Sequence, residues 1–90
     1  MKIDVIAYGY LMTLLGGKRT VNLKDGAPLD DLTTRLAASL GGVKKGHLGP
    51  YNVETDLIVL INGRNVKTLQ KPYPLTDGDV VTFIPPYMGG

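Results

Sequence analysis

One segment of this sequence has the spacing of an amphipathic helix, and it separates two regions that are patterned like β-strands. Over residues 28–40 leucines recur three or four positions apart, which places them on one face of a helix. They are Leu29, Leu32, Leu36 and Leu40. Pro28 suits the first helical position, Asp30 and Asp31 suit the positive end of the helix, and Gly41 ends it. The stripe is too short for a coiled coil, so we expect this helix to cover one face of a sheet.

Two strands are predicted before the helix. Apolar residues alternate with polar ones over residues 2–8, and a second alternation covers residues 19–23. Ile6 and Tyr8 make the second face of the first strand apolar as well, which favours a central or doubly covered strand. Between the strands, residues 10–15 fit a short helical turn that is stopped by glycine, with a bulged loop as the alternative. We expect the two strands to pair antiparallel.

The region after the helix predicts two further strands and a short return. Residues 43–56 have no strong period and are predicted to be a linker. Residues 57–61 are rich in β-branched side chains and predict a buried strand. Asn62-Gly63 is a strong hairpin signal, and the return begins at residues 64–66. The last strand is expected over residues 80–84, where two prolines cut it off.

This order of elements predicts an α+β fold, with a mixed sheet of four to five strands and one main helix packed on one face. The right-handed crossover rule places the last strand beside the first, as in the β-grasp arrangement of ubiquitin. A chain of 90 residues forms one small domain with no room for a deep cleft. We assign residues 1–84 to this domain and residues 85–90 to a projecting tail.

Composition excludes several classes of function. Without cysteine the chain can form no disulfide, thiolate zinc site or cysteine nucleophile, and a single histidine, His47, cannot build a multi-histidine metal site. The net charge of +2 is mild, and the small cluster at Lys44, Lys45 and His47 is typical of a solvated loop, so we expect no nucleic-acid partner. No apolar run approaches the ~20 residues of a membrane span, and the start lacks the pattern of a signal peptide. A cytoplasmic location with no membrane association is therefore expected.

The sequence does not predict a self-sufficient active site. Asp30 and Asp31 suit the start of the helix, while Asp77 and Asp79 flank a turn. No glycine pair matches a phosphate-binding loop. We therefore expect the chain not to be an enzyme, and to bind neither a metal nor a resident cofactor.

The C-terminal residues predict a different kind of chemistry. Pro85 and Pro86 favour an extended polyproline stalk that projects away from the sheet. Gly89 and Gly90 then form a thread without side chains, which can enter a narrow slot in another protein. The terminal carboxylate becomes an unhindered nucleophile towards an activated phosphate. We predict Gly90 as the reactive position, the alternative being an inert or truncated end.

These residues resemble a known family. Two stretches carry the resemblance, namely Leu57-Ile58-Val59-Leu60-Ile61-Asn62-Gly63-Arg64 and Pro74-Leu75-Thr76-Asp77-Gly78-Asp79-Val80-Val81-Thr82-Phe83-Ile84-Pro85-Pro86-Tyr87-Met88-Gly89-Gly90. They are similar to the MoaD/ThiS family of ubiquitin-like sulfur carriers, and the two prolines before the glycines are closer to MoaD, the small subunit of molybdopterin synthase. The sequence departs from the pattern of this family in two places, at the bulky pair Tyr87-Met88 and in the divergent linker at residues 43–56. They leave room for an archaeal-type protein modifier or a tRNA-thiolation carrier.

The resemblance implies a sulfur carrier for molybdenum cofactor biosynthesis. An adenylyltransferase of the ubiquitin-activating type would use ATP to adenylate Gly90, and a persulfide donor protein would convert it to a thiocarboxylate. The large subunit of molybdopterin synthase would then receive the tail. Gly89 would keep the tail narrow, because it carries no side chain. The partner contacts would come from Phe83, Pro85, Pro86, Tyr87 and Met88. A ubiquitin-like modifier that forms isopeptide bonds, a carrier for tRNA or thiamine, and a plain β-grasp interaction domain remain alternatives.

Overall fold

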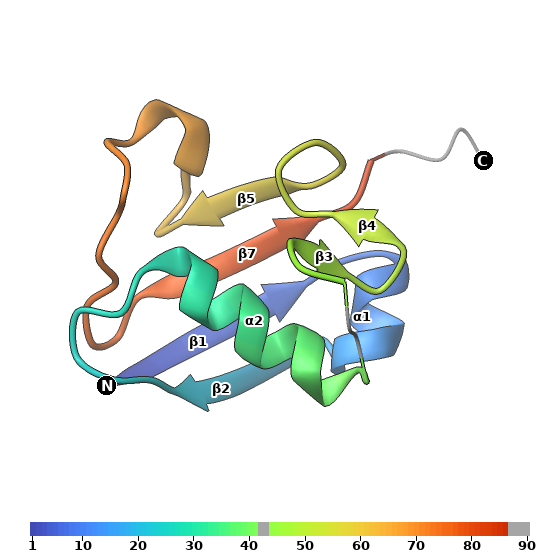
Figure 1. The fold of residues 1–90 in the computed structure, drawn as a ribbon, viewed down its shortest axis with the longest axis horizontal. Helices are drawn as coiled ribbons and strands as arrows, with labels where there is room; N and C mark the ends of the chain where they lie inside the picture. Colours follow the sequence, from blue (N-terminus) through green and yellow to red (C-terminus); the bar gives the residue numbers. More distant parts are fainter. Residues whose placement is uncertain (42–43, 87–90) are drawn as a thin grey trace.

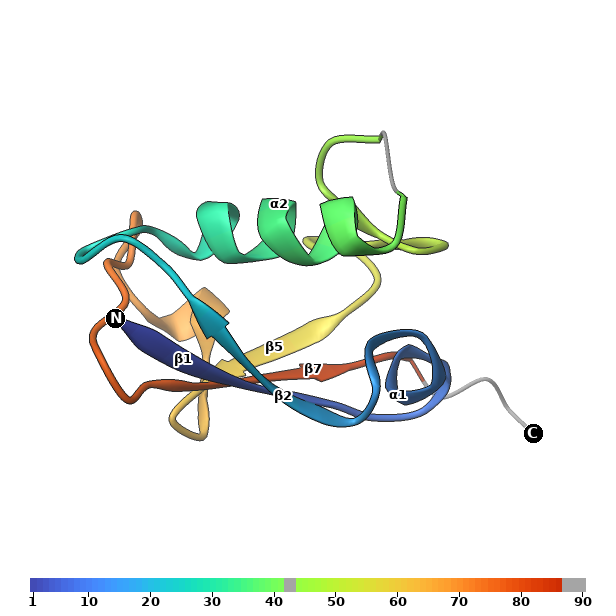
Figure 2. The same cartoon turned by 90° about the horizontal axis from the view of Figure 1, so that it is seen from below.

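The computed structural model describes residues 1–41 and 44–86, in which one helix covers one face of a five-stranded sheet (Figures 1 and 2). The elements are β1 (Lys2–Ala7), α1 (Tyr10–Leu15), β2 (Lys18–Asn22), α2 (Leu29–Ser39), β3 (His47–Leu48), β4 (Tyr51–Asn52), β5 (Ile58–Ile61), β6 (Arg64–Asn65), the short 3₁₀ helix η1 (Val66–Thr68) and β7 (Val80–Ile84). The strand order is β2-β1-β7-β5-β6, and only the pair β1 and β7 is parallel. This confirms the predicted α+β, β-grasp fold. No helix in the described ranges is long and apolar enough to cross a bilayer.

The core lies between α2 and the sheet, as the leucine spacing predicts. Leu32 and Leu36 are 0% exposed, and they face the buried side chains of the central strands. Thr33 is also turned inward, and its hydroxyl donates a hydrogen bond to the Asp30 carbonyl at 3.0 Å. The helix therefore buries one face, and the opposite face of the sheet stays open (Figure 2).

The open face corrects one prediction about β5. Residues 57–61 are expected to be buried throughout, yet Ile58 is 48% exposed while Val59 and Ile61 are 3% and 1% exposed. Side chains of a strand alternate between the two faces of its sheet, and α2 covers only one of these faces. The apolar run therefore supplies both the core and an exposed surface.

The predicted linker contains more structure than its sequence indicates. His47–Leu48 and Tyr51–Asn52 form a small antiparallel ribbon beside α2, and Leu48 is 0% exposed in the core. Strands of two residues are too short to display a hydrophobic period. After β6 the chain likewise leaves the sheet, because η1 begins at Val66.

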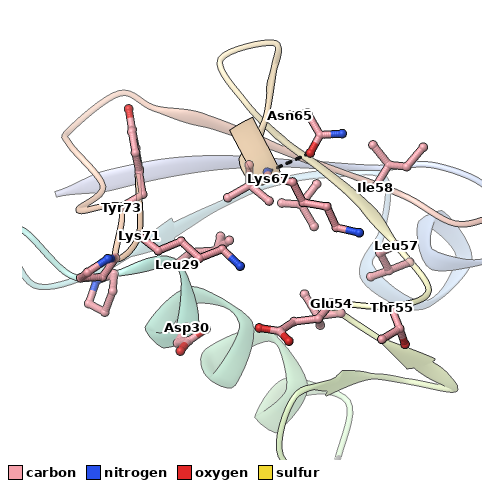
Figure 3. A pocket seen from close by; sticks show the side chains of 15 residues that line it. Leu29, Asp30, Glu54, Thr55, Leu57, Ile58, Asn65, Lys67, Lys71 and Tyr73 are labelled. Carbon is pink, nitrogen blue, oxygen red and sulfur yellow. Dashed lines mark hydrogen bonds between the residues drawn. The ribbon is translucent and has the colours of Figure 1, made fainter. Parts of the chain in front are cut away.

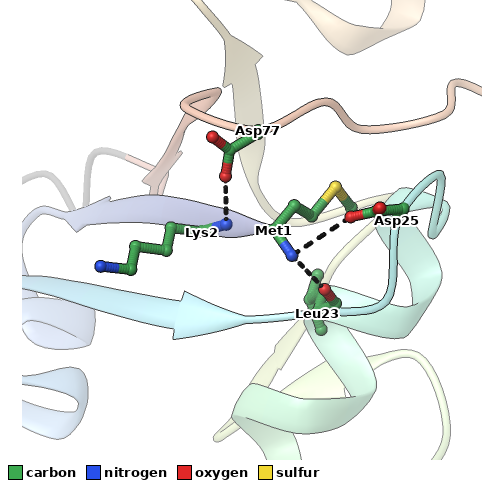
Figure 4. Close-up of polar contacts among 5 residues, drawn as sticks. All are labelled: Met1, Lys2, Leu23, Asp25 and Asp77. Carbon is green, nitrogen blue, oxygen red and sulfur yellow. Dashed lines mark hydrogen bonds and ion pairs between the residues drawn. The ribbon is translucent and has the colours of Figure 1, made fainter.

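Polar contacts tie the beginning of β1 to the residues that follow β2 and to the turn before β7 (Figure 4). The α-amino group of Met1 donates a hydrogen bond to the Leu23 carbonyl at 2.7 Å and lies 3.4 Å from an Asp25 carboxylate oxygen. The backbone N–H of Lys2 donates to the carboxylate of Asp77 at 2.6 Å. These contacts fix the end of the sheet that lies opposite the end of β7.

Asp79 is a buried structural carboxylate in the turn that precedes β7. It accepts hydrogen bonds from the Asn62 side chain at 2.8 Å, the Thr76 N–H at 2.8 Å and the Thr76 hydroxyl at 3.0 Å. Burial acts to raise the pKa of Asp79, but these hydrogen bonds favour the carboxylate and lower the pKa below its usual value. The ionised carboxylate therefore stabilises the fold fully at pH values above the pKa that Asp79 has in the unfolded chain. This stabilisation is lost as the pH falls through the lower pKa that Asp79 has in the folded chain.

Candidate functional site

The predicted stalk begins at the end of β7, which is held by a neighbouring strand on each side. β7 pairs parallel with β1 up to Ala7 and Phe83, and antiparallel with β5, where Ile84 lies opposite Ile58. The Tyr8 N–H donates a further hydrogen bond to the Phe83 carbonyl at 3.1 Å. Because these pairings continue to the last residues of β7, the chain leaves the sheet from a fixed point.

Gly9 leaves room for the first residue of the stalk. It has φ +60°, a backbone conformation that other residues rarely adopt, and a Cβ atom built on it would lie 3.3 Å from Cγ of Pro85. The proline ring thus packs against a position where the chain carries no side chain. Gly9 sets how Pro85 lies as it leaves β7.

We expect Gly9→Ala to shift Pro85 and to lower the stability of the domain. Alanine at this positive φ strains the backbone, which costs about 1–3 kcal/mol. In addition, its Cβ lies so close to the Pro85 ring that the ring must move. Thermal melting measures the first effect, and the NMR chemical shifts of Ile84 and Pro85 measure the second. Gly26→Ala is the matched control, because Gly26 has φ +77° and a Cβ atom built on it would have no neighbouring atom within 4 Å. Unchanged shifts at Pro85 in Gly9→Ala would show that Gly9 does not position the stalk.

Exposed apolar side chains surround the point where the stalk leaves the sheet. On the open face, Ile84 pairs with Ile58, and Tyr8 lies one position beyond the last registered pair of β1 and β7. Tyr8 is 52% and Ile58 is 48% exposed. We name Tyr8, Ile58 and Ile84 the open-face patch. Exposed apolar clusters of this kind mark surfaces that contact other proteins.

The first short helix adds to the apolar surface at the same end of the molecule. Figure 2 shows α1 at the end of the sheet where β7 finishes. Tyr10 and Met12 of this helix are 55% and 50% exposed. These two side chains therefore add exposed apolar surface at this end of the molecule.

At this site the described residues position the stalk and provide an apolar surface around it. Within residues 1–41 and 44–86, no group of three or more histidine, aspartate and glutamate side chains is arranged to hold a metal ion. His47 lies in β3, where a ring nitrogen is 3.3 Å from the Lys45 carbonyl oxygen. Asp79 is engaged in its hydrogen-bond network at the beginning of β7. The reactive group that the sequence predicts for this site is the carboxylate of Gly90.

The structure tests only part of the predicted site. Gly89 and Gly90 lie outside the described residues, as do Tyr87 and Met88.

The two prolines follow β7 directly, and Pro86 is exposed. The prediction that Phe83 contacts a partner is wrong, because Phe83 is 0% exposed. Alternation along β7 turns Phe83 towards α2 and leaves Ile84 on the open face.

Sequence reasoning missed Tyr8, Gly9 and Ile58 as parts of the site. A signal was present, since the first strand has apolar residues on both faces. That pattern correctly indicates a central strand, and β1 does lie between β2 and β7. It also marks an apolar surface on the uncovered face, which becomes evident only when the sheet has one helical layer.

Comparison with known proteins gives a consistent result. Residues 5–90 match the model of the ThiS family. The HVO 2177 protein of Haloferax volcanii is 27% identical over 100% of this chain and 87% of its own, with a TM-score of 0.74. Small archaeal modifier protein 1 of H. volcanii is 18% identical, with coverage of 96% and 98% and a TM-score of 0.72. A complex of subunits 1 and 2 of molybdopterin-converting factor from Helicobacter pylori is 21% identical, with full coverage of both chains and a TM-score of 0.56. Among curated proteins, none matches the chain in sequence.

Proposed function

This chain belongs to the ThiS family, and from that premise we propose that it is a sulfur carrier whose Gly90 carboxylate is adenylated and then converted to a thiocarboxylate. We further propose that the sulfur is delivered to a molybdopterin precursor, with this chain as the small subunit of molybdopterin synthase. The observation that carries the proposal is the end of β7, which is held on both sides and runs directly into Pro85-Pro86 beside an exposed apolar patch.

The reaction divides into steps that partner proteins catalyse. A carboxylate oxygen of Gly90 attacks the α-phosphorus of ATP and displaces pyrophosphate, which gives an acyl adenylate. The terminal sulfur of a protein persulfide then attacks the acyl carbon, and AMP leaves. A second thiol of the donor reduces the resulting acyl disulfide, so that the thiocarboxylate remains on Gly90 and the donor keeps a disulfide. The adenylyltransferase supplies ATP and the groups that stabilise charge at the phosphate.

The chain's own residues contribute shape and position. Gly89 keeps the thread slim enough for a narrow slot, and the two prolines restrict the stalk to an extended path. The open-face patch gives each partner a rigid surface at the root of the stalk. Because the chain has no cysteine, no internal thiol competes for the sulfur.

The choice of molybdopterin rests on the order of residues at the end of the chain. Phe83-Ile84 are followed by Pro85-Pro86 and, after two residues, by Gly89-Gly90. This order is closer to MoaD than to ThiS. The H. pylori complex of subunits 1 and 2 shares the fold with this chain, and a large subunit of that kind is the acceptor that we propose.

We expect the full chain to gain roughly 16 Da when it is incubated with ATP, its adenylyltransferase and a persulfide donor, since one terminal oxygen is replaced by sulfur. Intact-mass and fragment spectra would locate the change at Gly90. A variant with one extra residue after Gly90 is the control. It moves the reacting carbon by about 3.5 Å, out of reach of aligned attack, and should gain no mass.

The same experiment separates the competing functions. Heavier conjugates on lysines, without a thiocarboxylate, would indicate a protein modifier. A thiocarboxylate that the large subunit of molybdopterin synthase cannot use would refute delivery to molybdopterin while leaving the carrier chemistry intact. No mass change would contradict the whole proposal.

A further inference from the structure

Residues of α2 line two hollows in the surface, and the two hollows differ in charge. The larger has a volume of about 520 Å³ and lies along the outer edge of β5, where Figure 3 shows side chains of both signs. Its charged lining residues are Asp30, Glu54, Lys67 and Lys71. Two carboxylates thus balance two ammonium groups, so the charges of this groove favour neither an anion nor a cation.

The smaller hollow lies between α2 and the chain that leads into β3, and its volume is about 290 Å³. It is lined by Thr33, Thr34, Ala37 and Ala38 of the helix and by Lys44, Lys45, Gly46 and His47 of the following chain. None of these residues is acidic. Each lysine contributes one positive charge, so the lining carries +2 while His47 is neutral. We name it the basic hollow.

A hydrogen-bonded turn holds the cationic side of the basic hollow together. The His47 N–H donates to the Lys44 carbonyl at 3.3 Å, and Gly46 has φ +80° at the third position of this turn. The ring of His47 is also held, because its Nδ1 lies 3.3 Å from the Lys45 carbonyl oxygen, which can only accept a hydrogen bond. The next residue, Leu48, is buried in the core. The two lysines therefore extend from a backbone that is fixed beside α2.

The positive charge of the basic hollow is not neutralised within the described residues. The contact of the α-amino group with Asp25 is the one ion pair within residues 1–41 and 44–86. Asp30, in the first turn of α2, lines the groove of Figure 3 and not the basic hollow. The carboxyl end of a helix carries about half a negative charge, which offsets only part of the charge of two lysines. The basic hollow therefore attracts an anion.

We propose that the basic hollow binds a phosphate group. The ammonium groups of Lys44 and Lys45 bind the phosphate oxygens, and the Thr34 hydroxyl donates to a third oxygen from the helix side. A phosphate group carries about −1.5 to −2 charges at pH 7, which matches the charge of the lining, and lysine binds phosphate as a point charge. The inference does not depend on the chemistry of Gly90.

The size of the basic hollow also favours a compact anion. Sites for drug-sized ligands have volumes of roughly 300–1,000 Å³, and the basic hollow lies just below that range. Its two lysines are adjacent in the sequence and form no stripe along the surface, as a nucleic-acid backbone would need. A single phosphate group suits both observations.

A titration of the ¹⁵N-labelled full chain with sodium phosphate at pH 7 tests the proposal. We expect amide shifts centred on residues 33–38 and 44–47, with a Kd on the order of 1–10 mM, as suits a few exposed charge contacts. Sodium chloride at the same ionic strength is the control, because it screens surface charges without offering a divalent ligand. It should produce only a small part of these shifts.

A second ligand distinguishes the source of the phosphate group. Glycerol 1-phosphate presents the same oxygens on an organic carrier. Binding as tight as that of inorganic phosphate would support a site for a phosphate group that belongs to a larger molecule. Binding of inorganic phosphate alone would support a site for the free ion.

Charge variants make the test specific to the basic hollow. Lys44→Gln combined with Lys45→Gln should weaken phosphate binding about fivefold, because two exposed charge contacts are lost. Thr34→Asp, which removes no lysine but adds a carboxylate to the lining, should weaken it by a similar factor. Lys67→Gln combined with Lys71→Gln is the matched control, since it changes the net charge equally at the groove of Figure 3. It should leave the Kd within about twofold.

Three results would overturn the proposal. One is a set of shifts with sodium chloride as large as those with phosphate, which would show that only ionic strength is sensed. Another is equal weakening by the control pair of lysine variants, which would show that the net charge of the whole domain attracts the anion. The third is the absence of shifts at the basic hollow at phosphate concentrations several times the expected Kd.

Discussion

A chain that ends at Met88 should melt within about 1 °C of the full chain and should gain no sulfur. The last strand of the sheet ends at Ile84, and glycine carries no side chain to bury, so we expect removal of the two glycines to cost little stability. Truncation also removes Gly90, whose carboxylate carbon is the proposed reacting atom. Circular dichroism measures the melting temperature, and intact mass after incubation with ATP, the adenylyltransferase and the donor measures the sulfur.

Gly89→Ala separates the two roles that truncation removes together. It keeps the chain length and the terminal carboxylate but adds a methyl group to the thread. We expect slower mass gain with the same final product, since the slot must accommodate the new Cβ. A loss of several degrees in melting temperature on truncation would contradict the prediction, because it would show that the glycines are packed against the domain.

Leu36→Asp should unfold the domain. Leu36 is 0% exposed on the face of α2 that packs on the sheet, and the buried core of residues 1–41 and 44–86 contains no cationic side chain. An unpaired buried charge costs several kcal/mol, in addition to the lost apolar contact, and a domain of this size has only about 5–15 kcal/mol to lose. Loss of the cooperative thermal transition and collapse of NMR shift dispersion would report the effect.

Thr34→Asp is the matched control for that substitution. Thr34 lies two positions earlier on the same helix and is exposed, so the same carboxylate stays in water. We expect this variant to fold with a melting temperature close to that of the unchanged chain. A cooperatively melting Leu36→Asp protein would show that the buried face of α2 is assigned wrongly.

Most of the fold could be predicted from local patterns in the sequence. The leucine spacing placed the helix, whose predicted range of 28–40 contains α2 (Leu29–Ser39). Asn62-Gly63 predicted the hairpin between β5 and β6, and both residues have the positive φ values that such a turn needs. The prolines predicted the end of β7, and the crossover rule predicted its position beside β1.

The elements that escaped prediction are those whose structure depends on distant neighbours. The ribbon of β3 and β4 is too short to show a period and is held by packing against α2 through Leu48. Ile58 is exposed because α2 covers only one face of the sheet. A continuous apolar run does not indicate whether one face of its strand is covered or both. Phe83 was assigned to a surface for the same reason, since alternation alone does not say which face is covered.

The candidate site divides in the same way. Pro85, Pro86 and the glycine pair are visible in the sequence because they depart from the composition of an ordinary strand. Gly9 is not, because its role comes from Pro85, which lies far away along the chain but packs against it. The roles of Gly89 and Gly90 stay predictions.

The position of β7 between β1 and β5 has a mechanical consequence. A partner that draws in the stalk or releases it applies force along the axis of β7, and the ladders on both sides then bear this load in shear. Hydrogen bonds loaded in this way must yield together, whereas those of a strand peeled from its end yield one at a time. The N-terminus is anchored at the opposite end of the sheet (Figure 1). Tension applied at the end of β7 is therefore spread over the three central strands of the sheet.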